Sequence, residues 1–132
     1  MMRFPILLSV LSLPAVAQAE RWVEVAQGPF AVPTDALVQI RATLEQQITT
    51  AVRSRGATPP PWRDYLLQYR GKTVNGTRVV EIHGSCHFDD GNFDFASNFY
   101  DEQVMDGGEC YFVVYYTIES KRYSKVIFHG YA

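Results

Sequence analysis

A regular pattern of apolar residues marks the stretch between Pro33 and Gly56. Apolar side chains recur there at steps of three and four residues, the spacing of one face of an α-helix. They are Leu37, Ile40, Leu44, Ile48, Ala51 and Val52. Thr34 or Asp35 is expected to cap the start, and Gly56 lies just past the end, where a left-handed residue is favoured. The sequence therefore predicts a helix over residues 35–54 whose apolar face must be buried.

Two runs of alternating apolar and polar residues flank Asn75-Gly76. Asn-Gly between such runs is a strong signal for a two-residue β-hairpin loop. With this loop Tyr69 opposes Ile82, and the side chains divide into an apolar and a polar face. The apolar face holds Tyr65, Leu67, Tyr69, Val80, Ile82 and Cys86, and the polar face holds Gln68, Arg70, Lys72, Glu81 and His83. Because register and division agree, the sequence predicts an antiparallel hairpin.

Two further strands are predicted nearer the C-terminus. A Gly-Gly turn at residues 107–108 leads into a run of aromatic and β-branched residues, which favours a strand over residues 109–118. The alternate positions that share one face are Cys110, Phe112, Val114 and Tyr116. A last strand is predicted over residues 123–131. Residues 21–25 form too short a pattern to assign, and are either a short edge strand or an ordered lead-in.

These elements predict an α+β fold, with one N-terminal helix packed on a four-stranded antiparallel sheet. The helix is expected to lie with its apolar face on the apolar face of the hairpin. Residues 34–132 would form this single domain, and residues 20–33 would be an extended lead-in.

The first 19 residues have the pattern of a cleaved signal peptide. A short basic start carrying Arg3 precedes an apolar stretch over residues 4–13, which is too short to span a bilayer as a helix. Ala17-Gln18-Ala19 fits the small-x-small rule for signal peptidase, with a cut after Ala17 as the alternative. The other interpretations are an uncleaved anchor or a buried N-terminal helix. The prediction is export to the periplasm or the extracellular space.

The chain has two cysteines, Cys86 and Cys110, and both follow the predicted signal peptide. The exported compartment is oxidising, and the strands that carry the two residues are predicted neighbours, so we expect a disulfide. Two free buried thiols are the alternative. The loop between them has about 25 residues, for which the chain-entropy model gives about 3 kcal/mol of stabilisation.

Charge narrows the possible partners. The chain carries a net charge of −2, and loss of residues 1–19 would remove only Arg3 among the charged residues, giving −3. This mild acidity argues against a nucleic acid, which requires clustered Lys and Arg, and against an anionic membrane surface after cleavage. The expected partner is another envelope or secreted protein.

A resemblance to known proteins covers roughly residues 62–132. It is carried by the run Asp106-Gly-Gly-Glu-Cys-Tyr-Phe-Val-Val-Tyr, by Tyr69 after Leu67-Gln68, and by the ending Gly130-Tyr131-Ala132. In these features the chain resembles a set of small exported bacterial proteins of unassigned function with a DGG[DE]C[YF]F-type strand. The order of its elements resembles the cystatin-like architecture. The resemblance implies a fold class and brings no functional residues.

Motifs for catalysis or metal binding are weak. His83 and His87 lie about 13 Å apart on a strand, too far to share an ion, and are expected to be exposed. The series Asp90-x-Asn92-x-Asp94 mimics a calcium loop but lacks its glycine and its final glutamate. No cofactor is predicted. An acid–base enzyme assembled from Glu81, His83 and Asp89 is kept as an alternative to a protein without catalysis.

The long loop at residues 89–106 invites a functional interpretation. Its aromatic residues are Phe93, Phe95, Phe99 and Tyr100. They either plug the open end of the roll or form an exposed protein-binding surface. The main hypothesis is a small disulfide-stapled protein of binding or inhibitor type. The alternatives are a small-ligand-binding or hydrolytic protein with a pocket between helix and sheet, lined by Tyr65, Tyr69 and Tyr116, and a structural envelope protein.

Overall fold

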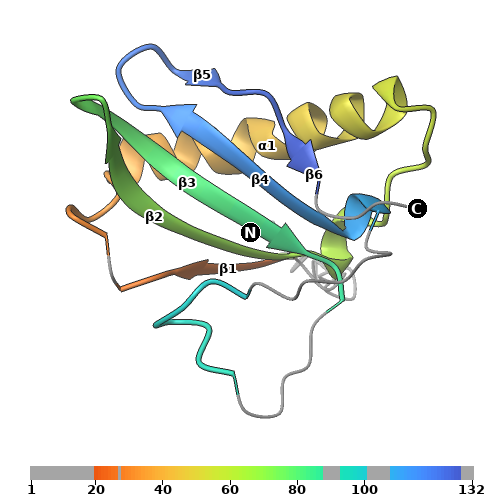
Figure 1. The fold of residues 1–132 in the computed structure, drawn as a ribbon, viewed down its shortest axis with the longest axis horizontal. Coiled ribbons are helices and arrows are strands. Elements are labelled where there is room, and N and C mark those ends of the chain that lie inside the picture. Colours follow the sequence, from red (N-terminus) through yellow and green to blue (C-terminus); the bar gives the residue numbers. More distant parts are fainter. Residues whose placement is uncertain (1–19, 27, 88–92, 101–107, 129–132) are drawn as a thin grey trace, which may run out of the picture.

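The computed structural model describes residues 20–26, 28–87, 93–100 and 108–128. It shows an α+β fold in which one long helix lies across one face of a mixed sheet (Figure 1). The elements are β1 (Arg21–Glu24), α1 (Thr34–Ser54), the 3-10 turn η1 (Trp62–Asp64), β2 (Leu66–Val74), β3 (Thr77–Ser85), the 3-10 turn η2 (Gly108–Cys110), β4 (Tyr111–Thr117), β5 (Arg122–Tyr123) and β6 (Ile127–Phe128). The strand order is β1-β2-β3-β4, and β5 and β6 both pair with β4.

The helix predicted over residues 35–54 is confirmed. Four residues of the predicted stripe are buried, Ile40, Leu44, Ile48 and Val52, and so is Ala36, whereas the predicted Leu37 and Ala51 are half-buried. Its end is also as expected, because Gly56 has a φ of +77°. The N–H groups of Gly56 and Ala57 donate to the carbonyls of Arg53 and Val52, which is the Schellman arrangement.

The predicted cap of α1 is wrong. The helix begins one residue earlier than expected, so Pro33 takes the cap position, and its carbonyl accepts the N–H of Leu37. Thr34 makes no capping hydrogen bond, and the Asp35 carboxylate accepts the N–H of Ala36 next to it. Proline can occupy this position because a cap residue needs no intrahelical N–H donor.

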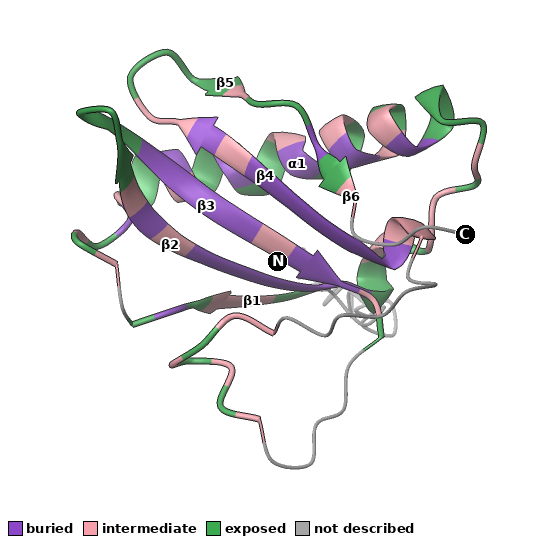
Figure 2. Cartoon of the chain, viewed as in Figure 1, coloured by how far each residue is buried: buried purple, intermediate pink, exposed green. Residues whose placement is uncertain are grey.

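The hairpin register is confirmed along its whole length. β2 and β3 are antiparallel, Val74 faces Thr77, Tyr69 faces Ile82 and Leu67 faces Gly84. The face predicted to be apolar lies on α1, and its residues join the buried side chains of the helix in one core cluster. Figure 2 shows this buried band along β2, β3 and β4.

The expectation of four antiparallel strands needs correction at both edges of the sheet. β1 is a strand, and it pairs with β2 in parallel, because α1 carries the chain back across the sheet before β2 begins. The last strand, expected over residues 123–131, is interrupted between Tyr123 and Ile127. At the break the Ser124 hydroxyl accepts the N–H of Tyr115, in the place of a backbone acceptor.

The predicted disulfide between Cys86 and Cys110 is present, with Cα atoms 4.9 Å apart. It joins Cys86, just after β3, to Cys110, the last residue of η2 before β4, and the N–H of Cys86 donates to the carbonyl of Cys110. Next to it, the ring of Phe112 lies directly over Gly84, where an added Cβ would collide with the ring. Phe112 then meets Tyr65 edge to face, with 5.3 Å between ring centroids. This end of the core is therefore closed by a covalent bond and by aromatic rings packed edge to face.

The N-terminal predictions are covered only in part. Residues 1–19, predicted as a signal peptide, lie outside the described residues. The lead-in at residues 20–33 contains β1, so part of it belongs to the sheet. Within the described ranges, no helix has both the length and the apolar character needed to cross a bilayer.

Replacing Gly84 with alanine is expected to lower the free energy of unfolding by about 1–3 kcal/mol, because the new methyl group overpacks against Phe112. Urea denaturation measures this loss. Adding Phe112→Leu to Gly84→Ala makes room and should return part of it. An unchanged urea midpoint for Gly84→Ala would show that the two residues are not in contact.

Replacing both Cys86 and Cys110 with alanine is expected to cost about 3 kcal/mol of unfolding free energy, because the disulfide closes a loop with a sequence separation of 24. The check is urea denaturation of the wild-type protein with and without reductant, beside the double variant. The reduced wild type and the variant should unfold together at lower urea. Coincident curves for oxidised and reduced protein would contradict the expectation.

Candidate functional site

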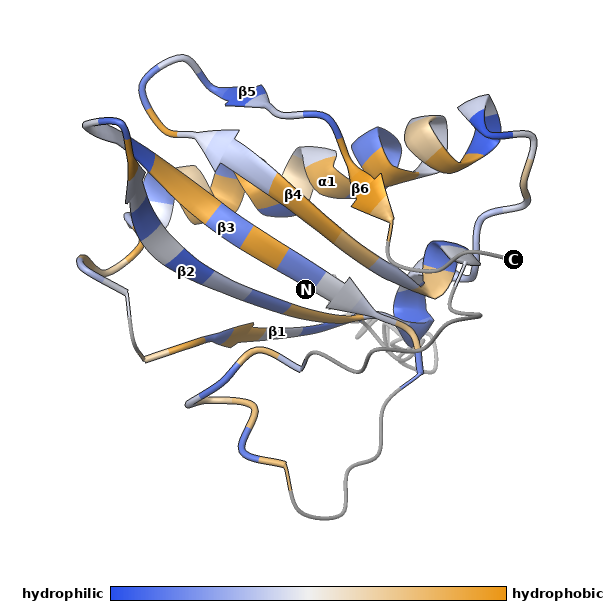
Figure 3. Ribbon diagram, viewed as in Figure 1, coloured by the Kyte–Doolittle hydropathy of each residue, from blue (hydrophilic) through white to orange (hydrophobic). Residues whose placement is uncertain are grey.

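The candidate site lies on the outer face of the sheet, which is the face opposite α1. Polar and apolar residues alternate along β3 (Figure 3), and this alternation directs the polar side chains of β2 and β3 to the outer face. The sequence predicted these residues but expected a solvated face. Instead Gln68 is 1% exposed and Glu81 is 6% exposed. The outer face is therefore a partly covered polar surface.

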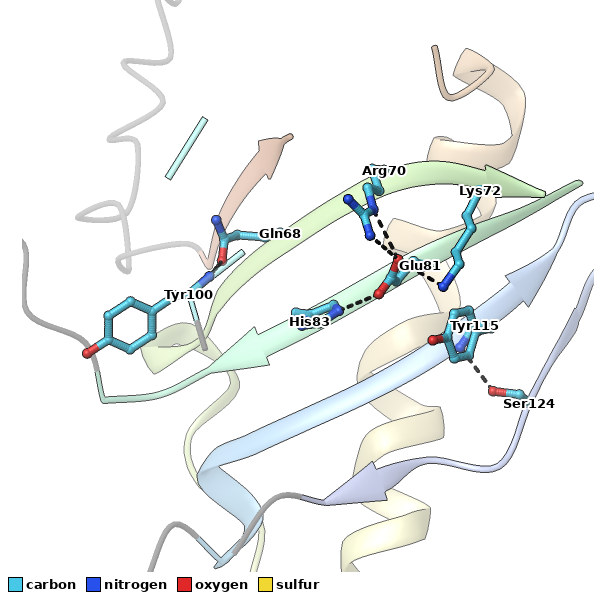
Figure 4. A network of polar contacts seen from close by, with 8 residues as sticks. All are labelled: Gln68, Arg70, Lys72, Glu81, His83, Tyr100, Tyr115 and Ser124. Carbon is cyan, nitrogen blue, oxygen red and sulfur yellow. Dashed lines mark hydrogen bonds and ion pairs between the residues drawn. The ribbon is translucent and has the colours of Figure 1, made fainter. Parts of the chain in front are cut away.

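Glu81 is the centre of this surface (Figure 4). Its Oε1 lies 3.0 Å from Nη2 of Arg70, its direct cross-strand neighbour, and 3.9 Å from Nζ of Lys72. Its Oε2 lies 2.8 Å from Nε2 of His83, two residues further along β3. Cross-strand pairing and the two-residue period thus bring three basic side chains to one carboxylate.

The electrostatics of Glu81 follow from these contacts. Burial raises the pKa of its carboxyl group, but the hydrogen bonds and charges of His83 and Arg70 lower the pKa by more, so it lies below its ordinary value. The carboxylate is therefore ionised at neutral pH and can only accept hydrogen bonds. Nε2 of His83 must carry the proton that it donates to Glu81.

His83 is held on a second side by an aromatic ring. Its imidazole stacks on Phe99 with 3.8 Å between ring centroids and 11° between ring planes. The guanidinium of Arg70 lies over the same phenyl ring, 4.7 Å from its centroid. Phe99 thus covers the pair of basic residues that hold Glu81. His83 was expected to be exposed, and the cover by Phe99 is the reason that this expectation is wrong.

Phe99 belongs to the aromatic segment, residues 93–100, which is fixed to the sheet by the side-chain amide of Gln68. Nε2 of Gln68 donates to the carbonyls of Phe95 and Asn98, both at 2.8 Å, and its Oε1 accepts the N–H of Tyr100 at 2.7 Å. The N–H of Ala26, just after β1, donates to the carbonyl of Ala96. The segment is neither helix nor strand, so some of its backbone groups need other hydrogen-bond partners. One buried amide side chain supplies them.

The remaining aromatic side chains of this segment pack on one another. Phe93 lies 4.9 Å from Phe95 and 5.2 Å from Tyr100, centroid to centroid. Both phenylalanines and Tyr100 are half-buried. The sequence analysis offered a plug in the open end of the roll as one interpretation. The structure attaches the segment to Gln68 and His83 of the outer face, while residues 89–92 and 101–106 of the predicted loop lie outside the described residues.

A cavity of about 240 Å³ opens on the outer face over β3 and β4. Its floor is made by side chains of β3 and β4. Tyr100 of the aromatic segment lies on one flank, and Ile127 of β6 lies on the other. Its lining includes Glu81, His83, Val113, Tyr115, Tyr100 and Ile127. Register places Tyr115 opposite Glu81 and Val113 opposite His83. The cavity thus runs from a charged end to an apolar one.

The other candidates from the sequence do not gather at this cavity. Tyr65, Tyr69 and Tyr116, expected to line a pocket between helix and sheet, are buried members of the core cluster. His87 is exposed, and Asp89, Asp90 and Asn92 lie outside the described residues. In the part of the chain that the structure describes, no three His, Cys, Asp or Glu side chains are grouped closely enough to hold a metal ion.

Comparison with known proteins finds no matching family model, no matching curated protein and no matching solved structure. The function must therefore be inferred from the outer face itself. Sequence reasoning did not identify Gln68 as important. The available signal was a lone uncharged amide among the charged residues of a predicted polar face.

Glu81→Gln should lower the free energy of unfolding by about 2 kcal/mol at neutral pH, because charged hydrogen bonds to a buried carboxylate are lost. The pKa of Glu81 is lower in the folded protein than in the unfolded chain. Its contribution is therefore present above the unfolded pKa and disappears as pH falls through the folded pKa. Urea denaturation from pH 7 down to strongly acidic pH should show the two proteins converging only on the acid side.

Glu119→Gln is the matched control, because Glu119 also meets an arginine, Arg78, at 3.0 Å but on the exposed surface. It should cost much less at every pH, since solvent screens the pair. Equal losses for the two variants, or a Glu81→Gln loss that does not change with pH, would contradict the role given to burial.

Proposed function

We propose that this protein is an exported, disulfide-stapled protein of binding or inhibitor type that acts without catalysis. Its partner would be another envelope or secreted protein, and the contact would be made by the aromatic segment. The observation that carries the proposal is the attachment of this segment to the sheet through Gln68, with Phe93, Phe95 and Tyr100 half-buried at the surface. Fixed aromatic side chains lose little entropy on binding.

The chemistry of the segment suits a protein interface. Aromatic residues are enriched where protein partners meet, and rings packed on a rigid sheet offer a large contact area in one geometry. Backbone groups of the segment already have partners in Gln68 and Ala26, so docking need not order them. These features support a preformed binding surface.

Export is part of the proposal and has two supports. The Cys86–Cys110 disulfide is typical of an oxidising compartment. The N-terminal pattern at residues 1–19 is that of a signal peptide cut before Glu20. Together they favour the periplasm or the extracellular space.

We also propose that the fold is a cystatin-like roll extended by one parallel edge strand. The support is the layout of a single long helix across the β2-β3-β4 meander. A scaffold of this kind leaves the outer face and its loops available for partners.

A small-ligand-binding or hydrolytic protein is the second candidate. The observation that favours it is the Glu81–His83 pair at the wall of the outer cavity. In this version the pocket lies on the outer face and not between helix and sheet.

The double variant Phe93→Ser/Phe95→Ser tests the protein-binding proposal. The tagged mature protein is cross-linked in an envelope extract, and captured proteins are quantified by mass spectrometry. A partner retained by wild type should fall at least about tenfold with the variant, because aromatic contacts dominate such interfaces. Val38→Ser is the control, since Val38 is 62% exposed on α1, the helix on the opposite face of the sheet.

Identical partner lists for wild type and the double variant would overturn the proposal. Thermal denaturation must accompany the capture, because an unfolded variant loses every partner. If the double variant unfolds at a much lower temperature, the single variant Phe93→Ser replaces it, since the ring contacts of Phe93 within the described ranges are with Phe95 and Tyr100.

A further inference from the structure

Beside the charged end of the outer cavity, basic side chains outnumber acidic ones. Arg70 and Lys72 lie beside Glu81, while the chain as a whole has a net charge of −2. One carboxylate cannot use all their donors, since a guanidinium has five N–H groups and an ammonium three. Nζ of Lys72 is 3.9 Å from Oε1 of Glu81, beyond hydrogen-bond length, and its side chain is half-exposed. This end can therefore accept a second anion.

His83 also lines this cavity, with Nδ1 as its second ring nitrogen. Its Nε2 is committed to Glu81, and stacking on Phe99 fixes the ring. Among the described residues, no hydrogen bond reaches its Nδ1, although His83 lines the cavity. In the tautomer with its proton on Nε2, Nδ1 is an acceptor, so it can meet an N–H or O–H group of a ligand but not a carboxylate oxygen.

The other end of the cavity is lined by apolar side chains, one of which is largely exposed to solvent. Val113 forms its floor, and Ile127, which faces Val113 across the β4–β6 pair, is 51% exposed. Tyr100 comes from the opposite side, where its N–H is held by Gln68 on β2. An apolar group between Tyr100 and Ile127 would remove the exposed surface of the isoleucine from water.

We propose that the outer cavity binds a small organic monocarboxylate with a compact apolar or aromatic body. The carboxylate meets Nζ of Lys72, which lies over the ring of the cavity residue Tyr115, and the body lies over Val113 between Tyr100 and Ile127. The volume of about 240 Å³ lies below the range of about 300–1,000 Å³ typical for drug-sized ligands, so a compact acid fits and a large one does not. This inference goes beyond the protein-binding proposal and does not depend on it.

The charges around Glu81 determine which ligand charge the cavity prefers. It stays ionised and buried beside the charged end, so it repels a dianion such as a phosphate monoester more than a singly charged carboxylate. An organic cation would instead be repelled by the positive charges of Lys72 and Arg70. A neutral amide of the same shape fills the apolar end but gains nothing from the charged one.

NMR titration of the mature protein with a panel of small carboxylates and their amides tests the proposal, with benzoate and benzamide as the leading pair. Benzoate should shift the methyl resonances of Val113 and Ile127, and should bind at least about tenfold more tightly than benzamide, as a charged hydrogen bond in a partly buried site predicts. Added salt should weaken the binding of benzoate and leave that of benzamide unchanged.

Variants assign the binding to this cavity. Lys72→Met should weaken benzoate about three- to tenfold, the loss of one partly exposed charge pair. Arg53→Met removes the same charge from the last turn of α1, on the other side of the sheet, and should change nothing. Phe93→Ser/Phe95→Ser should still bind benzoate, so this proposal and the protein-binding proposal fail separately.

Three results would overturn the inference. They are equal affinities for acids and their amides across the panel, shifts confined to residues away from the outer cavity, and no shift with any member up to its solubility limit. An equal effect of Lys72→Met and Arg53→Met would also count against it, because it would show long-range attraction and no local site.

Discussion

The register of the β2–β3 hairpin is the constraint on which the rest of the structure depends. The Asn75-Gly76 turn fixes it, with Asn75 at φ 50° and Gly76 at φ 78°, as a two-residue hairpin loop requires. This register turns Leu67 and Ile82 toward α1, and Gln68 and Glu81 toward the outer face. A slip by one residue would exchange the two faces, so core and candidate site are specified together.

Two polar side chains then turn the outer face from a solvated surface into a structured one. Gln68 forms hydrogen bonds with the backbone of the aromatic segment, and Glu81 accepts hydrogen bonds from Arg70 and His83. Phe99 links the two sets, because it stacks on His83 and lies beneath the guanidinium of Arg70. Each buried polar group is satisfied, with no unpaired buried side-chain N or O atom among the described residues. Such a network favours one arrangement of the segment over others.

Local patterns predicted the parts of the fold that local interactions decide. The apolar stripe gave α1, the Asn-Gly pair gave the hairpin, and two cysteines on neighbouring strands gave the disulfide. The parallel pairing of β1 could not be predicted, because four residues carry little pattern and the pairing depends on where α1 returns the chain. The docking of residues 93–100 was missed for a related reason. Its hydrogen-bond partner Gln68 lies about 30 positions away in sequence, and no pattern within the segment indicates that its backbone pairs with this side chain.

The measurement that tests the outer face most directly is the NMR contact between Phe99 and His83 in the oxidised protein at neutral pH. The structure predicts strong cross-relaxation between the two rings, whose centroids are 3.8 Å apart, and slow exchange of the Tyr100 amide hydrogen that Gln68 accepts. Absence of both, with random-coil shifts across residues 93–100, would contradict the account, because the aromatic segment would then be detached from the sheet.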